Sequence, residues 1–437
     1  MAKKLRQNEL KEPNRRSNSS ILTMINPIYN LLPLNFLLFF IYNMKLSNCA
    51  TIQLKVNEIG NHQIFSEYYD IEKYYPFKIS INDEVQILRD KKVLVEKLQA
   101  NFKNYEIKIE WKTTYPNLTH MFANLSSITA IKLDNMFAMN CDLSYMFYNC
   151  TNLQNISITN TLLNAVNDMS HMFFNCHSLQ NFSFASLNLN SIIYYIDMSY
   201  IFFNCSNIKY LIYGNNYIPV RDMQNSFYNC ISLNSINLNK FISQDNINMS
   251  YTFYNCYSLN SVSIENNNLK VNDIRYMFYN NTALENLIIK FNSVSNSFYN
   301  MSYAFYNCVN LLTLNFDNWY IQPNDMRNMF YNCSSLNSIE LKLGTSDTDV
   351  NMTRMFYNCN NITIIEFNIG SDPSYYFPND LHAMFYNCTN LTKVSLNHFN
   401  TDKVLDMSYM FFNCINLENF IKDYVSKLQK IRIFRLT

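Results

Sequence analysis

The most chemically reactive residues in this sequence are cysteines that recur at a regular spacing. Ten of the twelve cysteines fall in one column, from Cys150 to Cys414. Regular thiols are typical of a disulfide framework, a metal site or a structural core. Asn281 divides the column into two blocks of five, so complete pairing between adjacent rows is impossible. We therefore predict buried, free thiols that act as small hydrophobic side chains.

The other chemistry-bearing residues form no recognised catalytic pattern. None of the six histidines belongs to a His-x-x-x-His motif or stands at zinc spacing from cysteine. With four glycines, the chain contains no glycine-rich phosphate loop, and it lacks Gly-x-Ser-x-Gly. Repeated rows supply no unique polar cluster of the kind that catalysis requires. The sequence predicts a protein that is not an enzyme, with no cofactor and no metal.

The elements that must position these residues are internal repeats of 25 to 29 residues. Each repeat has an asparagine two residues after a central phenylalanine, and Asp or Asn five residues before it, as in Asp325–Leu341 (DMRNMFYNCSSLNSIEL). A period of this length predicts a solenoid. The twelve central residues are Phe122, Phe147, Phe173, Phe202, Phe227, Phe253, Phe278, Phe305, Phe330, Phe356, Phe385 and Phe411.

Each column of the repeat suggests a structural role. The Asp or Asn precedes Met-Ser-x-Met-Phe and is placed to cap a short helix. The Ile-x-Leu pair, as in Ile236 and Leu238, has the period of a strand with both side chains inward. The asparagine column predicts a ladder of amides that bond from row to row. The expected fold class is an α/β leucine-rich-repeat solenoid, a parallel sheet with one short helix per repeat.

The repeats occupy residues 117–422, and three other segments flank them. Residues 1–50 are basic, then apolar without charge from Ile21 to Met44, which predicts a signal peptide or a signal anchor. An uncleaved apolar segment packed on the fold is the alternative. Residues 51–116 are expected to form an α+β N-terminal cap, with a turn at Gly60-Asn61 and a helix over Lys91–Phe102. Residues 423–437 are expected to form a basic C-terminal cap.

Charge is unevenly distributed along the chain. The net charge is +1, yet residues 117–420 hold twelve Lys or Arg against twenty Asp or Glu. An acidic stack is a poor electrostatic match for nucleic acid, so no nucleic-acid partner is expected.

The sequence predicts a binding surface on the concave face of the sheet. The residue between the two inward strand positions faces outward, and solenoids use such faces for partners; a merely solvated face is the alternative. An aromatic column after the central Phe is either an exposed strip or ring packing within the stack. The expected partner-binding residues are Ser157, Ser183, Asn237, Ser263, Asn315, Glu340, Glu366 and Ser395.

Asn-x-Ser/Thr sequences are frequent and would be glycan acceptors in an exported protein. Those within Asn-Cys-Ser/Thr lie in the expected amide ladder and are poor candidates. The candidate acceptors are Asn117, Asn155, Asn248, Asn300, Asn351 and Asn390.

The unit D-M-S-Y-M-F-Y-N-C-x-x-L-x-x-I-x-L resembles the BspA-like leucine-rich repeats of microbial surface proteins and the related repeat of Mycoplasma surface lipoproteins. The resemblance covers Asn117–Lys422. It implies a right-handed leucine-rich-repeat solenoid that adheres to host or matrix proteins. This chain departs from the family in having Tyr and Asn where the usual unit has small residues or glycine.

Together these features predict an extracellular or cell-surface protein that binds a protein or glycan and touches a membrane only through an N-terminal anchor. The alternative is an intracellular interaction scaffold, favoured by the unpaired thiols, and a cytoplasmic location if the N-terminal segment is not a signal. The sequence leaves the ligand and the oligomeric state open.

Overall fold

A computed structural model of the chain describes residues 50–417 with short gaps. The chain divides into two units, Met1–Asn48 and Cys49–Thr437, and the second contains every residue described below. The expected signal segment and the basic C-terminal cap lie outside the described residues. In the described part of the chain, no helix is long and apolar enough to cross a membrane. The gaps are 57–59, 70–75, 77, 82–83, 87–91, 96–104, 112–117, 136, 140, 160–161, 165, 188, 190–193, 265–267, 292–298, 317–320, 344–348, 370–376 and 397–398.

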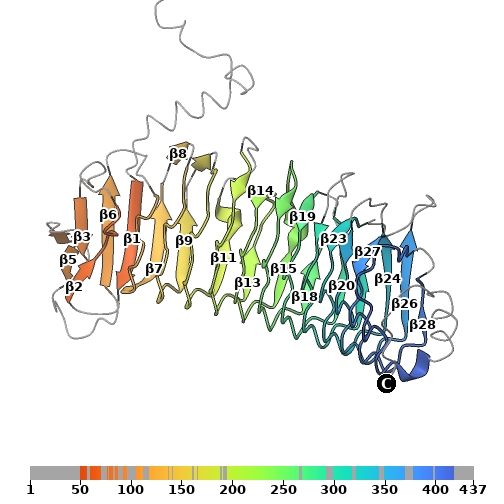
Figure 1. Cartoon of the computed structure of the whole chain (residues 1–437). Helices are drawn as coiled ribbons and strands as arrows, with labels where there is room; N and C mark the ends of the chain where they lie inside the picture. The colour runs from red at the N-terminus through yellow and green to blue at the C-terminus, as the bar shows by residue number, and fades with distance from the viewer. Residues whose placement is uncertain are drawn as a thin grey trace, which may run out of the picture. The chain divides into compact units, whose positions relative to one another are not determined.

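The described chain is a parallel β-solenoid whose rows follow one another from β7 to β28 (Figure 1). One strand per row follows the cysteine column, and we call these strands the repeat sheet. Pairing places equivalent residues of adjacent rows side by side, as for Ile236 and Val262. The repeat sheet comprises β7 (Ile128–Asp134), β9 (Asn155–Thr159), β11 (Asn181–Ser183), β13 (Tyr210–Ile212), β15 (Ser235–Asn237), β18 (Ser261–Ser263), β20 (Asn286–Ile288), β22 (Thr313–Asn315), β24 (Ser338–Leu343), β26 (Ile364–Ile369) and β28 (Lys393–Val394).

A second set of strands crosses each row before the Met-Phe segment, and these strands also pair in parallel. Most of them end at the Asp/Asn column, as β19 ends at Asp273, whereas β8, β10 and β16 end before it. Their bounds are β8 (Phe137–Met139), β10 (Leu162–Asn164), β12 (Ile196–Asp197), β14 (Ile218–Asp222), β16 (Phe241–Ile242), β17 (Ile247–Asn248), β19 (Val271–Asp273), β21 (Tyr299–Asn300), β23 (Pro323–Asp325), β25 (Val350–Asn351) and β27 (Pro378–Asp380).

The expected helix in each repeat is wrong, because the Met-Phe-Tyr-Asn segment forms consecutive turns. In the second row, Met146, Tyr148 and Cys150 donate backbone N–H bonds to the residue three positions back, at 3.0–3.2 Å. The alternate residues Tyr145, Phe147 and Asn149 donate to the next row at 2.7–3.0 Å. The described residues contain no α-helix; they hold three 3-10 segments, Phe184–Ser186 (η2), Leu238–Lys240 (η3) and Ile415–Leu417 (η4).

Two residues per row in the left-handed region explain why a helix cannot form. The first is two positions before the central Phe and the second is the invariant asparagine, as in Tyr145 (φ 56°) and Asn149 (φ 59°). A right-handed helix requires negative φ at every residue, and asparagine tolerates positive φ better than most residues. Each of these residues is the third of a four-residue turn, where type II turns have positive φ.

The Asp/Asn column makes the bond that was expected of a cap, but within a turn. In eleven rows its side-chain oxygen accepts the backbone N–H two residues later, as Asp168 does from Ser170 at 2.8 Å. This is an Asx turn, which Asp and Asn form equally well because both present the same oxygen. The chemistry of the column was therefore predicted correctly and its element was not.

The described part of the N-terminal cap consists of strands. β1 (Ala50–Val56), β3 (Lys78–Ile81), β4 (Glu84–Gln86) and β6 (Tyr105–Trp111) extend the repeat sheet in antiparallel order, and β1 pairs with β7 of the first row. The expected helix over Lys91–Phe102 is wrong where it is described, because β5 (Lys92–Val95) pairs with β2 (Gly60–Gln63). That pairing also places Gly60-Asn61 in a strand and not in a turn.

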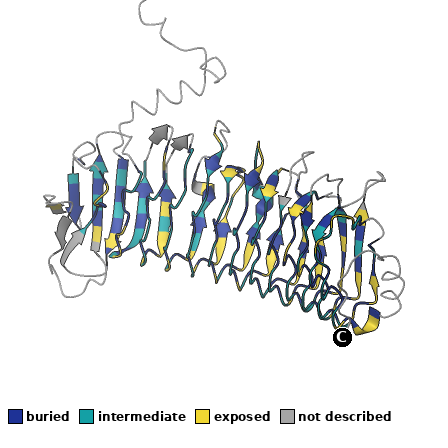
Figure 2. Ribbon diagram, viewed as in Figure 1, coloured by how far each residue is buried: buried dark blue, intermediate teal, exposed yellow. Residues whose placement is uncertain are grey.

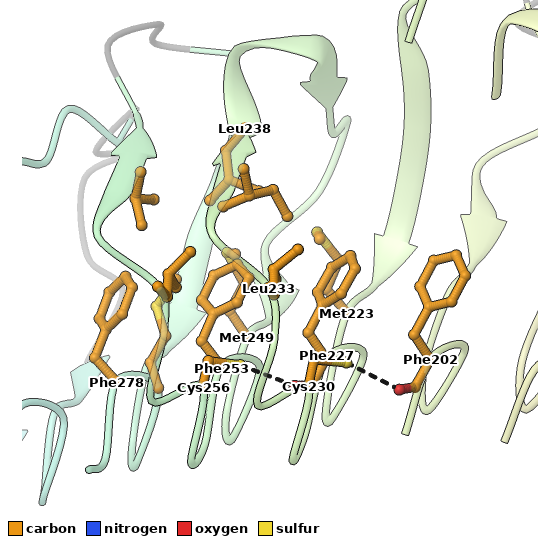
Figure 3. Close-up of a cluster of buried hydrophobic side chains, with 14 of the residues drawn as sticks. Phe202, Met223, Phe227, Cys230, Leu233, Leu238, Met249, Phe253, Cys256 and Phe278 are labelled. Atoms are coloured by element: carbon orange, nitrogen blue, oxygen red, sulfur yellow. Dashed lines mark hydrogen bonds between the residues drawn. The ribbon is translucent and has the colours of Figure 1, made fainter. Parts of the chain in front are cut away.

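The core runs along the inside of the rows, as the dark blue positions in Figure 2 show. Each row contributes its central Phe, and most rows add a Met, the Cys and the apolar residues of the strand; nearly all of these side chains are buried. The Phe rings stack from row to row with centroids 5.1–5.8 Å apart. Figure 3 shows this stack between Phe202 and Phe278.

Candidate binding surfaces

The cysteine column is structural, as predicted. All eleven described cysteines are free and buried. In ten rows the thiol donates to the carbonyl oxygen of the central Phe in the preceding row, as Cys230 does to Phe202 at 3.1 Å (Figure 3). Burial raises the pKa of Cys150 and of Cys308 to about 12, so these thiols carry little thiolate at neutral pH and are poor nucleophiles.

The two departures from the column have separate explanations. Asn281 donates its Nδ2 to the Phe253 carbonyl at 2.8 Å and so replaces the thiol donor. Its Oδ1 is buried without a hydrogen-bond partner among the described residues. Leu125 stands in the first row, which has no preceding central Phe to accept such a bond.

The asparagine column forms the predicted ladder. Asn255 donates its Nδ2 to Asn229 Oδ1 at 2.9 Å, and eight further steps repeat the bond at 2.6–3.1 Å. The ladder lies at the surface, since most of its members are half-buried. The four asparagines of Asn-Cys-Ser/Thr use their Nδ2 in these bonds, which agrees with their exclusion as glycan acceptors.

The eight residues expected to bind a partner are brought together in one outward column of the repeat sheet. Ser157, Asn315 and Glu340 are exposed, and Ser183, Asn237, Ser263, Glu366 and Ser395 are half-buried. Register makes them neighbours, as Asn237 faces Ser263 and Glu340 faces Glu366. Both acids already have partners: Glu340 accepts from Asn368 at 2.6 Å and Glu366 pairs with Lys393 at 2.6 Å.

Sequence reasoning missed a second outward column on the same face. In β13, β20 and β22 the first residue of the strand also points out, so a buried residue is flanked by two exposed ones, as in Tyr210-Leu211-Ile212. The signal was present in the period-2 alternation. Large apolar side chains on this face include Tyr210, Ile212, Ile288 and Ile364, between 37% and 49% exposed. Polar serine and asparagine positions therefore alternate with exposed apolar ones.

A third surface, the turn face, consists of stacked aromatic rings. The residue after the central Phe stacks in an unbroken series from Tyr148 to Phe412, with centroids 4.5–4.9 Å apart. These side chains are half-buried. Both interpretations of the column thus apply at once, because the rings pack on one another and still meet solvent.

A shorter ladder runs beside the first at the left-handed position before Met-Phe. Its rings stack from His120 to Tyr200 and again from Tyr251 to Tyr303, at 4.5–4.7 Å. Asn225, Asn328, Arg354 and Ala383 replace the ring in four rows.

The candidate glycan acceptors fall into two structural groups. Asn155 and Asn390 are exposed, whereas Asn248, Asn300 and Asn351 are half-buried and accept Asx-turn bonds through Oδ1. Asn117 lies outside the described residues. Among the residues that are described, no group of three or more His, Cys, Asp or Glu is arranged to hold a metal ion.

These features define a repeat protein of the β-solenoid class. Its regular columns form the core and the ladders between rows, and its variable columns face solvent. The chain belongs to the family described as "Mycoplasma protein of unknown function, DUF285", which matches residues 93–190, 141–267, 247–367 and 378–433. Comparison with curated proteins found no match.

Two solved leucine-rich-repeat structures are similar over about two thirds of this chain. The TLR13–ssRNA13 complex aligns at 17% identity and a TM-score of 0.28 over 67% of this chain, which spans only 43% of the TLR13 chain. An internalin, InlF of Listeria monocytogenes, aligns at 16% identity and a TM-score of 0.27, covering 65% of this chain and 85% of that one.

Proposed function

We propose that this protein is a non-enzymatic binding protein, exported to a cell surface, that recognises a protein or glycan through the outer face of the repeat sheet. The observation that carries the proposal is that some columns of the repeat hold the stack together and others face solvent. Packing and row-to-row hydrogen bonds involve the Phe, Met, Cys, Asn and Asp/Asn columns. The outward strand positions change from row to row, so they are free to encode a partner.

The composition of that face supports a binding role. Exposed Ile212 and Ile288 are separated by Asn237 and Ser263 in the same column, which gives single apolar side chains within a polar surround. Interfaces commonly combine a few apolar anchors with a polar rim. The resemblance to BspA-like adhesins, and membership of a family named for Mycoplasma proteins, favour a surface location and an adhesive role.

An intracellular scaffold is the second candidate, favoured by the eleven free thiols. The thiols do not distinguish the compartments by themselves, because buried donors with a raised pKa stay reduced in either. Labelling of intact cells with a membrane-impermeant amine reagent distinguishes the two. A surface protein is labelled before lysis, and a protein labelled only after lysis contradicts export.

The test of the face is a charge substitution on the full chain. Ile212→Glu together with Ile288→Glu should reduce binding to immobilised host-matrix proteins or glycans by about tenfold or more, since a charge in an apolar contact is not compensated. Ile231→Glu is the matched control, because Ile231 is 41% exposed, against 43% and 44% for Ile212 and Ile288, and lies outside the repeat sheet. Equal binding by all three proteins would exclude the repeat sheet as the contact surface.

A further inference from the structure

The shorter aromatic ladder is interrupted near the C-terminal end of the repeats, where Asn328, Arg354 and Ala383 replace the ring in three consecutive rows, and a depression opens there. Ala383 takes the position that Tyr409 takes in the next row and Arg354 in the row before. The depression has a volume of about 450 Å³ and is lined by Tyr331, Arg354, Tyr357, His382, Ala383, Tyr386 and Tyr409. Ala383 itself is only 2% exposed. We call this depression the Ala383 slot.

Arg354 brings an uncommitted positive charge to the slot. Arg221, Arg275 and Arg327 each form an ion pair with an aspartate, at 2.7–3.6 Å. Arg354 is exposed and forms no ion pair with any residue that the structure describes. Burial raises the pKa of Tyr357, and the Arg354 guanidinium opposes that rise, which indicates that the cation acts on this phenol. Asp406 is the acid at the other side, and it is engaged by the Ser408 N–H at 2.7 Å and by His382 at 3.3 Å.

The missing ring also leaves an aromatic face without its ladder partner. Elsewhere in this ladder each ring is stacked on its neighbour at 4.5–4.7 Å, but Tyr409 meets His382 edge-on, at 6.0 Å and 84°. Rows of a sheet repeat at ~4.8 Å, so Arg354 and Tyr409, two rows apart, are separated by roughly 10 Å along the stack. That separation accommodates one ring between the guanidinium and the phenol.

The polar groups around this space indicate what kind of ring it would take. A phenol hydroxyl both donates and accepts hydrogen bonds, whereas a carboxylate only accepts. Tyr357, Tyr386 and Tyr409 therefore suit a ligand with several hydroxyl groups, and Arg354 suits an attached carboxylate through a charge-assisted, bidentate bond. We infer that the Ala383 slot binds an acidic sugar residue, a hexuronate or a similar carboxylated sugar, with its C–H face on Tyr409 and its carboxylate on Arg354.

This inference rests on the proposed binding function, but it uses a different surface from the repeat sheet. The two can therefore fail separately. A protein whose partner contacts the repeat sheet should keep that partner when the slot is altered, and loss of slot binding leaves the sheet test unaffected.

The experiment measures binding of trigalacturonate to the full chain by calorimetry, with maltotriose and a triglutamate peptide as comparison probes. Arg354→Gln should weaken trigalacturonate binding by about tenfold or more, because it removes the charge-assisted bond. Arg221→Gln is the matched control, since it removes the same charge from an arginine paired with Asp168 and Asp197; its binding should be unchanged.

Ala383→Tyr supplies a second variant with a compatible backbone. Tyrosine adopts positive φ at the same position in six other rows, so the backbone accepts the substitution. Because Ala383 is only 2% exposed, the new ring must also displace the side chains that cover it. The variant should lose trigalacturonate binding, and its melting temperature and circular dichroism spectrum check that the fold is kept. The inference is overturned if the wild-type chain does not bind trigalacturonate, if Arg221→Gln weakens binding as much as Arg354→Gln, or if maltotriose or triglutamate binds as tightly as trigalacturonate.

Discussion

At the scale of single residues, the cysteine column shows how one hydrogen bond can select a residue type. The position requires a small side chain that is compatible with an apolar core and donates one bond to a carbonyl of the preceding row. A thiol meets that requirement without a second polar group to satisfy. Asparagine at 281 meets it only in part, because its amide also brings an acceptor into the core.

A reciprocal exchange tests this account. Asn281→Cys should raise stability by about 1 kcal/mol or more, since it keeps a donor to Phe253 and removes the orphaned Oδ1. Cys256→Asn should lower stability by a similar amount. Denaturant midpoints of the two variants and the wild type measure the effect. A destabilised Asn281→Cys protein would mean that the amide oxygen has a partner that compensates its burial.

At the scale of the element, the conformation of the turn is decided by two left-handed residues and not by helix propensity. Met, Leu and Phe at these spacings are compatible with an amphipathic helix, and the Asp/Asn before them with a cap. Rows that stack at strand spacing need alternate N–H groups to point along the stack, as Phe147 and Asn149 do. In an α-helix, the interior N–H groups all donate to carbonyls of the same helix, so none can donate to a neighbouring row.

The invariant asparagine therefore contributes in two ways, which substitution can separate. Asn229→Gly keeps the positive φ at no steric cost and loses the ladder bonds, whereas Asn229→Ala loses both. We expect Asn229→Ala to cost about 1–2 kcal/mol more than Asn229→Gly. Thermal midpoints measure the difference, and Asn234→Ala is the control because Asn234 is exposed and outside the ladder. Equal thermal midpoints for the Gly and Ala variants would show that the positive φ at position 229 does not determine their stability.

At the scale of the whole molecule, the N-terminal cap covers the strand edge and the apolar cross-section that the first row would otherwise expose. β1 pairs with the edge of β7 through six of its seven residues, and Ile52 and Leu54 are fully buried beside the first row. A solenoid without a cap presents an open strand edge and an apolar cross-section, which favours aggregation.

Deletion of the cap measures that contribution. A chain that begins at Leu118 should aggregate or elute as a mixture of large species, because β7 loses its partner strand. A chain that begins at Cys49 keeps the whole second unit and should elute as one species in size-exclusion chromatography. A soluble, single species from the shorter chain would show that the first row caps itself.

The spacing of residues in the sequence is enough to predict the rows, their number, the buried free thiols, the amide ladder and the outward strand column. Each follows from a residue type that recurs at a fixed spacing. In a stacked repeat protein, residues one repeat apart in the sequence become neighbours in adjacent rows. The alternation of apolar and polar residues in β1, β3 and β6 is likewise typical of strands.

The conformation of the chain between those columns depends on contacts with neighbouring rows, which the sequence pattern does not reveal. The Met-Phe segment is a run of turns because the neighbouring rows, and not the segment itself, take its N–H groups. The strand at Lys92–Val95 exists because β2 lies beside it, although its own pattern is that of a helix. The Ala383 slot arises in the same way, since an alanine becomes a binding space only when its neighbours in adjacent rows are large and aromatic.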